Sequence, residues 1–350
     1  MYLTYSAGML NNSLFYSKQS SNIRKLMKAF VTGGTGFIGS HLVEALLKSK
    51  EYSEVRCLVR SQEKWLSGYD FKKISGDLQD LQALSEGLEG ADVVFHIAAI
   101  VKAPTKKEFT HANVDATENI VRLAQKKGVK NMVILSSLAA AGPSNGSPKT
   151  ETEPMNPVSM YGESKKEMEV KIHKASQKTD SIKIVRPPAV YGPREDQIYS
   201  FFKSFSKGIC PIVGDGNNPR LSMVYVGDLV NGILKAAQKS DSGVHTYFIS
   251  GEGTHSWNEI RGITSKVMGK KALAIKIKPK LVKKAAAVIE NVASLLGKYP
   301  VVNKEKANEL ILEWTCSTEK AQKELGYTPE VSLAEGISRT IHWYKMHNWL

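Results

Sequence analysis

The chain has 350 residues, of which 42% are hydrophobic and 23% are charged, and it carries a formal net charge of +14 at pH 7. This length is enough for one large or two modest domains with a buried core, and the composition excludes a collagen, a coiled coil and a chain that is disordered throughout. The positive charge raises the question of a nucleic-acid or anionic-membrane partner.

Residues 1–27 differ in composition from the rest of the chain. They contain the cations Lys18, Arg24 and Lys25, no acid, and many Asn, Ser and Gln residues. No apolar run in them has the length of a signal peptide or a membrane span. We expect a disordered extension or the product of an upstream start codon, with a transit peptide as a weaker alternative.

Apolar strands alternate with amphipathic helices from residue 28 to residue 186. Such alternation predicts a parallel sheet with right-handed crossover connections. Strands are expected at residues 28–32, 55–59, 73–75, 93–97, 132–135 and 182–185. Helices are expected from the first glycine-rich turn to about Leu47, at residues 81–88 and 113–127, and from about Tyr161.

After Arg186 the pattern changes, because prolines and glycines become frequent. Short elements there are expected to form a smaller region over the carboxyl ends of the strands, where ligands bind in such folds. We therefore predict an α/β Rossmann fold. Its doubly wound parallel sheet spans residues 28–186. Residues 187–350 form a smaller, mixed C-terminal substrate-binding region, and some of its elements return to the sheet.

A lysine-rich segment lies within the C-terminal region. Residues 265–306 hold eleven lysines and two acids, Glu290 and Glu305. We interpret this segment as a solvated face, with contact to an anionic membrane as the alternative; few arginines or aromatic residues lie among the lysines, so we expect no nucleic acid partner. Apolar residues three and four apart predict a helix over residues 279–296 that packs on the body, covers an apolar substrate or rests on a membrane. These residues are Leu281, Ala285, Val288, Val292 and Leu295.

Three glycines follow the first strand at intervals of three residues. Gly33 permits a tight turn from strand to helix, Gly36 lets a pyrophosphate approach the backbone, and Gly39 lets the helix pack close to the strand. The start of the helix then offers free N–H groups to phosphate. The turn predicts a dinucleotide site, and we include Phe37 and Ile38 among its residues.

The end of the second strand indicates which dinucleotide binds. An acidic residue there would bind the ribose 2′-hydroxyl of NAD, but this chain has Arg60, with Lys64 shortly after it. A cation suits a 2′-phosphate, so NADP(H) is favoured and NAD(H) remains the alternative.

The ends of the third and fourth strands complete the expected cofactor site. Asp77 follows the third strand, where its carboxylate could accept a hydrogen bond from the adenine amino group, and Leu78 comes next. Ala98 and Ala99 end the fourth strand, and their small side chains leave room for the cofactor.

Tyr161 and Lys165 are the expected catalytic pair. Their spacing of four places both side chains on one face of a helix. A nearby ammonium stabilises a phenolate, so we expect Lys165 to lower the pKa of Tyr161 and to make it a general acid and base. Ser137 lies at the end of the fifth strand, from which its hydroxyl can hydrogen-bond the reacting oxygen.

Taken together, these residues resemble the extended short-chain dehydrogenase/reductases, also called the NAD-dependent epimerase/dehydratase family. The resemblance covers about residues 28–347 and implies Ser137, Tyr161 and Lys165 as the catalytic trio. It also implies that Asn113, which we group with the cofactor site, supports this trio, and that Pro188 contacts the nicotinamide end. The matching motifs are Thr32-Gly-Gly-Thr-Gly-Phe-Ile-Gly39, Gly76-Asp77-Leu78, His96-Ile-Ala-Ala99, Asn113-Val114, Ser136-Ser137, Tyr161-Gly-Glu-Ser-Lys165, Arg186-Pro-Pro-Ala-Val-Tyr-Gly-Pro193, Val224-Tyr-Val-Gly-Asp228 and Leu325-Gly-Tyr-Thr-Pro329.

Within this family the sequence disfavours a dehydratase, because no carboxylate follows Ser137. Sugar epimerases typically have a tyrosine before Gly142, where this chain has alanine, and the spacing of Arg220 to Val226 is one residue off their diphosphate-binding pattern. The apolar stretch 138–141 points to a less polar substrate. The C-terminal sequence around residues 314–329 resembles the dihydroflavonol-reductase and 3β-hydroxysteroid-dehydrogenase branch.

We therefore expect an oxidoreductase that transfers hydride to or from a carbonyl or secondary alcohol of a small, hydrophobic substrate. The alternatives are a nucleotide-sugar epimerase with tightly bound NAD and a non-catalytic, cofactor-bound scaffold or sensor. The resemblance also makes a homodimer plausible.

The remaining reactive side chains are expected to be structural. His96 follows an apolar strand and His41 lies in the first helix, and the histidines show no ligand spacing, so we expect no metal. The cysteines Cys57, Cys210 and Cys316 are widely spaced and indicate small buried side chains in a reducing compartment, for which we expect the cytoplasm.

Overall fold

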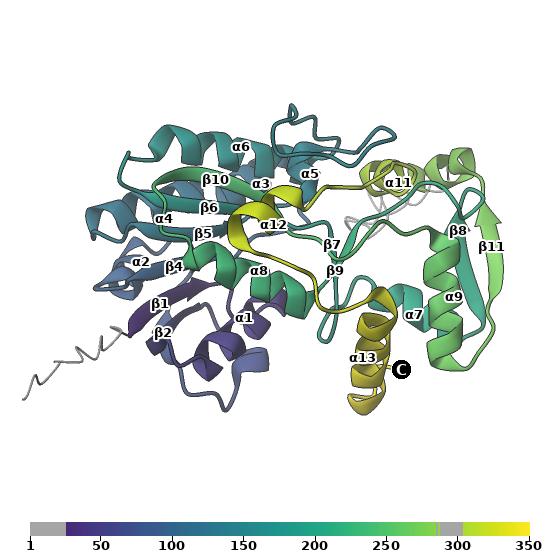
Figure 1. The fold of residues 1–350 in the computed structure, drawn as a ribbon, viewed down its shortest axis with the longest axis horizontal. Coiled ribbons are helices and arrows are strands. Elements are labelled where there is room, and N and C mark those ends of the chain that lie inside the picture. The colour runs from purple at the N-terminus through teal and green to yellow at the C-terminus, as the bar shows by residue number, and fades with distance from the viewer. Residues whose placement is uncertain (1–25, 285, 288–303) are drawn as a thin grey trace, which may run out of the picture.

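The computed structural model describes residues 26–284, 286–287 and 304–350. Its main sheet has seven strands in the order β10-β6-β5-β4-β1-β2-β3, and every neighbouring pair is parallel (Figure 1). The predicted Rossmann fold is therefore confirmed. The strands are β1 (Met27–Thr32), β2 (Tyr52–Val59), β3 (Lys72–Ser75), β4 (Val93–His96), β5 (Asn131–Leu135), β6 (Ser181–Arg186) and β10 (Gly243–Phe248).

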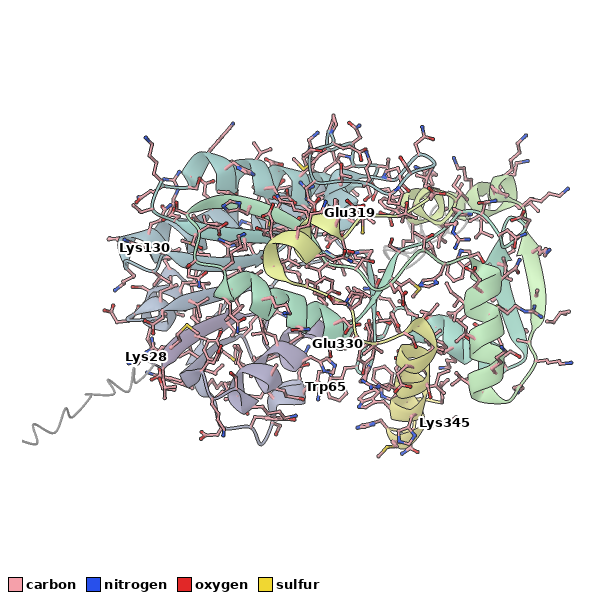
Figure 2. All side chains as sticks on the ribbon, in the orientation of Figure 1. Lys28, Trp65, Lys130, Glu319, Glu330 and Lys345 are labelled. Atoms are coloured by element: carbon pink, nitrogen blue, oxygen red, sulfur yellow. The ribbon has the colours of Figure 1, made fainter. Side chains whose placement is uncertain are left out.

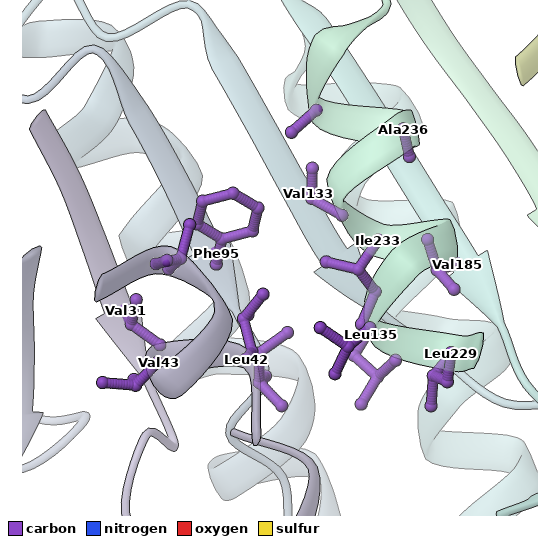
Figure 3. Packing of buried hydrophobic residues seen from close by; sticks show 14 of the residues in the cluster. Val31, Leu42, Val43, Phe95, Val133, Leu135, Val185, Leu229, Ile233 and Ala236 are labelled. Atoms are coloured by element: carbon purple, nitrogen blue, oxygen red, sulfur yellow. The ribbon is translucent and has the colours of Figure 1, made fainter. Parts of the chain in front are cut away.

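Both faces of this sheet are covered, since successive residues of a strand point to opposite faces and both sets are apolar. One face packs against α1 and α8, through residues such as Val31, Leu42 and Ile233 (Figure 3). The other face packs against α2, α4 and α6, through residues such as Phe30 and Ile184. These helices are α1 (Phe37–Lys48), α2 (Leu81–Leu88), α4 (Ala116–Lys126), α6 (Met160–Ala175) and α8 (Val226–Gln238).

The strand order reverses between β1 and β4, which are neighbours in the sheet. Chain connections leave in opposite directions at such a point, and a crevice opens at the carboxyl ends of the two strands. Short elements line this end of the sheet: η1 (Lys64–Leu66), α3 (Lys106–Phe109), η2 (Thr110–Asp115) and α5 (Leu138–Ala141). The helix predicted over residues 113–127 begins within η2, a π-helical segment, and continues as α4.

The C-terminal half contributes to two parts of the molecule. Strand β10 pairs with β6 at the edge of the main sheet, while two further pairs of parallel strands, β11–β8 and β7–β9, lie outside it. Figure 1 shows β8, β11 and α9 at the end of the molecule opposite β1 and β2. The remaining elements are β7 (Ala189–Tyr191), α7 (Tyr199–Ser206), β8 (Ile209–Val213), β9 (Met223–Tyr225), α9 (Trp257–Met268), β11 (Leu273–Ile277), α11 (Lys304–Leu310), α12 (Glu319–Leu325) and α13 (Leu333–Met346).

Two predicted segments lie partly outside the described residues. Of the N-terminal extension, only residues 26 and 27 are described, and residue 27 already begins β1. Of the helix predicted over residues 279–296, the described residues 279–284 and 286–287 are helical. Within the described parts of the chain, none of the helices has the length and apolar character needed to cross a membrane.

Candidate active site

The glycine-rich turn brings backbone close to the carboxyl end of β4. Gly33 has a φ of +75°, and a Cβ on it would lie 2.5 Å from the backbone nitrogen of Ala98. A Cβ on Gly39 would lie 2.0 Å from the carbonyl oxygen of Gly33, so the first turn of α1 can pack this tightly only without a side chain. Helix α1 begins after Gly36 with no side-chain cap and no acid in its first turn, where Phe37 and Ile38 lie. The backbone N–H groups of this first turn have no side-chain partner at the cap, and they fit the pyrophosphate of a dinucleotide.

The expected adenosine-binding residues lie on two neighbouring loops. Arg60 directly follows β2 and is exposed, and Asp77 follows β3 and is also exposed. The two loops are joined by a 3.2 Å hydrogen bond from the Gly76 nitrogen to the Val59 carbonyl oxygen. Leu78, beside Asp77, is half-buried. The structure thus brings a cation and a carboxylate to the same end of the sheet as the glycine turn.

Ser137 and Tyr161 come together through the contact of α5 with α6. Ser137 follows β5 and caps α5 by accepting a 3.1 Å hydrogen bond from the Ala139 nitrogen, and its hydroxyl lies close enough to that of Tyr161, in the first turn of α6, to lower the pKa of the phenol. Between the helices, a Cβ on Gly162 would lie 2.5 Å from the carbonyl oxygen of Ala139. Glycine at this position therefore permits the close approach that joins the two hydroxyls.

Lys165 is buried one turn beyond Tyr161. Its Nζ donates a 2.8 Å hydrogen bond to the carbonyl oxygen of Leu135, the last residue of β5. Burial lowers the pKa of Lys165 to about 8, against the opposing effect of the Glu169 carboxylate. The predicted trio of Ser137, Tyr161 and Lys165 is thus assembled at the carboxyl end of β5.

The expected lowering of the Tyr161 pKa is not observed. Burial raises the pKa of Tyr161 to about 12; the hydrogen bond to Ser137 lowers it and the nearby negative charge of Glu309 raises it further. Desolvation disfavours the phenolate more than the hydrogen bond favours it. The phenol is therefore protonated at neutral pH and ready to donate its proton.

A buried ion pair lies behind the trio. Glu169 accepts hydrogen bonds from Arg186 Nε at 2.9 and 3.2 Å and from its Nη2 at 2.5 Å, and the Ser136 hydroxyl donates to the same carboxylate at 2.5 Å. Both charged side chains are almost fully buried, and the Arg186 guanidinium lies 5.6 Å from the ring centre of Phe248. The pair joins α6 to β6 one helical turn from Lys165.

His96 and Asn113 belong to a chain of hydrogen bonds that crosses the site. The Thr117 hydroxyl donates to the Asn113 carbonyl oxygen at 2.7 Å, so it accepts from His96 Nε2 at 2.8 Å. His96 Nδ1 then accepts from the Thr32 hydroxyl at 2.6 Å. The Asn113 side chain bonds the backbone of Ile100 and, at 3.0 Å, the Ser164 hydroxyl of α6.

The buried His96 is expected to make the protein acid-sensitive. Burial and the charge of Lys165 lower its pKa from 6.5 to about 3. Between these pH values the unfolded chain binds a proton that the folded chain does not, so stability falls as the pH falls. From about pH 7 to about pH 5 the wild type should lose about 2 kcal/mol of unfolding free energy more than His96→Gln, measured by urea denaturation. Replacing the exposed His173 with Gln should leave the wild-type loss unchanged; equal losses in the wild type and His96→Gln would contradict the assignment.

Sequence reasoning missed two acids of α11 that reach the active site. Glu305 accepts a 3.0 Å hydrogen bond from the backbone nitrogen of Met160, at the start of α6. Glu309, one turn further along α11, lies close enough to Tyr161 to raise its pKa. Their spacing of four residues puts both acids on one face of the helix, but nothing in the local sequence indicates which element that face meets.

The apolar stretch after Ser137 does not line the site as expected. Leu138, Ala140 and Ala141 are buried, and Leu138 and Ala141 pack with Phe248 and Cys316. The stretch was therefore the wrong reason to expect a less polar substrate, because its side chains belong to the core.

Arg220 also has a structural assignment. Its Nε donates to the Thr254 hydroxyl at 2.9 Å, and its Nη2 donates to the Thr254 carbonyl oxygen and lies 3.4 Å from Glu259. These contacts occupy the guanidinium with protein acceptors.

Pro188 is buried after β6, and the carbonyl oxygen of its neighbour Pro187 accepts from the Leu138 nitrogen at 2.8 Å. The three cysteines are buried and unbridged. No group of His, Cys, Asp or Glu suited to a metal ion occurs among the residues that the structure describes.

Comparison with known proteins gives a family match and full-length relatives. The model of the "NAD dependent epimerase/dehydratase family" matches residues 29–250. The ceramide reductase of Caulobacter vibrioides (strain NA1000 / CB15N) is 28% identical over 324 residues, covering 91% of this chain and 95% of the relative. The 3beta-hydroxysteroid-dehydrogenase/decarboxylase isoform 1 of Arabidopsis thaliana is 28% identical over 344 residues, covering 89% and 78%.

A solved structure of a protein with a different activity also matches this chain. The UDP-glucuronic acid 4-epimerase from Bacillus cereus, in complex with UDP-glucuronic acid and NAD, superposes with a TM-score of 0.74 at 25% identity, covering 92% of this chain and all of that chain (100%). The fold is thus shared by reductases, dehydrogenases and sugar epimerases.

Proposed function

The chain belongs to the NAD-dependent epimerase/dehydratase family, as its motifs predict, and on that premise we propose that it is a reductase or dehydrogenase of a carbonyl or secondary alcohol. The observation that carries this proposal is the contact of Ser137 with Tyr161 at the carboxyl end of β5, with Lys165 one turn behind. This arrangement offers a protonated phenol and a second hydroxyl at the crevice where a dinucleotide binds.

Each residue of the trio has a separate task. Tyr161 donates its proton to the substrate oxygen in the reductive direction and accepts it in the oxidative direction. Ser137 holds the same oxygen by a hydrogen bond and so fixes its position. Lys165 lies one helical turn from Tyr161 and donates a hydrogen bond to the Leu135 carbonyl oxygen; its positive charge would favour the phenolate left after proton transfer. The dinucleotide, when bound on the glycine turn, supplies or accepts the hydride.

We further propose that the substrate is apolar. Two relatives that align with about nine-tenths of this chain act, by name, on a ceramide and on a steroid. No carboxylate follows Ser137 to assist loss of water, and Arg220 is engaged by Thr254 rather than free for a diphosphate.

The second candidate is a nucleotide-sugar epimerase, which the likeness to an NAD-bound epimerase favours. The two functions differ in how they hold the cofactor. A reductase releases the dinucleotide after each turnover, whereas an epimerase oxidises and re-reduces its substrate on one retained NAD.

Titration calorimetry with NADPH and NADH tests the proposal, after the absorbance of the purified protein has been checked for retained cofactor. We expect exchangeable binding with a preference for NADPH, because exposed Arg60 follows β2, where the adenosine ribose lies in this fold. Arg60→Ala should weaken NADPH binding by about tenfold or more and leave NADH binding unchanged, since only the 2′-phosphate is lost as a partner.

Lys126→Ala, on the far helix α4, is the matched control and should change neither affinity. Retained NAD, or NADPH binding that is indifferent to Arg60, would overturn the cofactor assignment. Retained NAD would also favour the epimerase over the reductase as the function of this protein.

A further inference from the structure

The two-stranded sheet β8–β11 has an apolar face that points outward. The strands pair in parallel, with Leu273 opposite Ile209 and Ile275 opposite Pro211. The side chains of Cys210 and Ile212 point to the inner face of this sheet, where they are buried against α7 and α9. Alternation therefore directs Ile209, Pro211, Val213, Leu273, Ile275 and Ile277 to the opposite face, on which every side chain is apolar.

Several of these side chains are unusually exposed. Leu273 is 72% exposed, Ile209 45% and Ile275 43%, and Leu281, just beyond β11, is 54% exposed. Single exposed apolar residues are common, but a contiguous apolar sheet face on a protein surface marks an interaction site.

Lysines surround this apolar face. Between Glu259 and Glu290 the chain carries eight lysines and one arginine and no acid. Exposed Lys271 and Lys278 bracket β11, and Figure 2 shows nitrogen-tipped side chains extending outward at this end of the molecule. Among the described acids, Asp215 lies near Lys276 and offsets part of the charge.

We propose that the outer face of β8–β11, with the lysines around it, docks on an anionic lipid surface. Exposed aliphatic side chains at the centre can enter the boundary between headgroups and acyl chains, while lysines attract anionic headgroups. The ammonium group of a lysine can reach a lipid headgroup while the methylene groups of the same side chain cover apolar surface. A polyanion such as RNA would use the lysines but gain nothing from Leu273 and Ile275.

Other features support a lipid surface rather than a second protein. The patch lies at the end of the molecule opposite β1 and β2 (Figure 1), so docking would leave the crevice at the β1–β4 switch point open. Charged residues such as lysine are depleted at the centre of interfaces between proteins, whereas a membrane-facing surface is enriched in lysine beside its apolar side chains.

Flotation of the full chain with lipid vesicles tests the proposal. Vesicles of equal parts phosphatidylcholine and phosphatidylserine should bind the wild type, vesicles of phosphatidylcholine alone should bind it weakly, and high salt should release it. The double variant Leu273→Ser, Ile275→Ser should bind anionic vesicles about tenfold or more weakly, because its apolar contacts are removed. The double variant Lys271→Glu, Lys278→Glu should lose a similar part of its affinity for anionic vesicles, because each lysine near the membrane surface is attracted to the anionic headgroups.

The matched control is Lys126→Glu with Lys130→Glu, a charge change of equal size at the far end of the molecule, where Lys130 is seen in Figure 2; its binding should stay within about twofold of the wild type. Unchanged NADPH affinity in all variants checks that they fold. Equal binding to neutral and anionic vesicles, or vesicle binding that survives the serine substitutions, would overturn the proposal. So would concentration-dependent self-association that Leu273→Ser abolishes, because the face would then cover a second copy of the chain.

Discussion

Replacing Tyr161 with Phe is expected to lower the rate of hydride transfer by about 10³-fold while leaving the affinity for NADPH unchanged. The substitution removes one oxygen atom and keeps the ring, which packs 6.2 Å from the ring of Phe109. It removes the proton donor for the substrate oxygen and the partner of the Ser137 hydroxyl. The glycine turn, which carries the expected cofactor site, is not touched.

The measurement is single-turnover oxidation of NADPH with a panel of apolar ketones, combined with calorimetric titration of NADPH. Tyr52→Phe is the control, since Tyr52 begins β2, away from the carboxyl ends of the strands, and should retain wild-type turnover. Undiminished turnover in Tyr161→Phe would remove the phenol from the mechanism, whereas joint loss of turnover and cofactor affinity would indicate damage to the fold.

Replacing Glu169 with Gln should destabilise the protein by about 3–5 kcal/mol, because it leaves the Arg186 guanidinium buried without its counter-charge. This guanidinium already has one nitrogen, Nη1, without a hydrogen-bond partner. Since folded domains are stable by only about 5–15 kcal/mol, the loss should appear as a large fall in the urea midpoint.

A double-mutant cycle separates the ion pair from other effects of the substitution. Glu169→Gln combined with Arg186→Met removes both charges and should cost less than Glu169→Gln alone, because no uncompensated charge is left in the core. Glu335→Gln, which breaks an exposed pair with Arg339, should cost less than about 1 kcal/mol. A loss for Glu169→Gln no larger than that for Glu335→Gln would mean that water reaches the pair.

The parts of the site that were predictable are those encoded by short-range patterns. The strand, glycine turn and helix at residues 28–48 follow from local periodicity and from the steric need for glycine, and the structure shows the φ of +75° at Gly33 that only such a residue adopts easily. Tyr161 and Lys165 share a helix, so their spacing alone placed them on one face.

The remaining features depend on contacts between residues far apart in the sequence. Glu309 acts on Tyr161 from 148 positions further along the chain, and Arg186 contacts Glu169 from a different element. Periodicity reports that a face is apolar but not what it packs against, which is why the stretch after Ser137 was mistaken for a substrate lining. The sign of the Tyr161 pKa shift was missed for a related reason, since burial is set by tertiary packing.

The edge strand β10 has a consequence for how the protein can be divided and how it folds. Its residues Gly243–Phe248 pair with Ser181–Arg186, so the dinucleotide-binding sheet is completed by chain that follows the first substrate-region elements. A fragment ending after β6 would lack β10, so β6 would become an edge strand with unpaired backbone groups exposed to solvent. Such edges can pair with other chains and cause aggregation. During synthesis, the same edge remains unprotected until about sixty further residues have emerged from the ribosome. The family match ends at residue 250, directly after this strand, so the matched segment reaches every strand of the seven-stranded sheet.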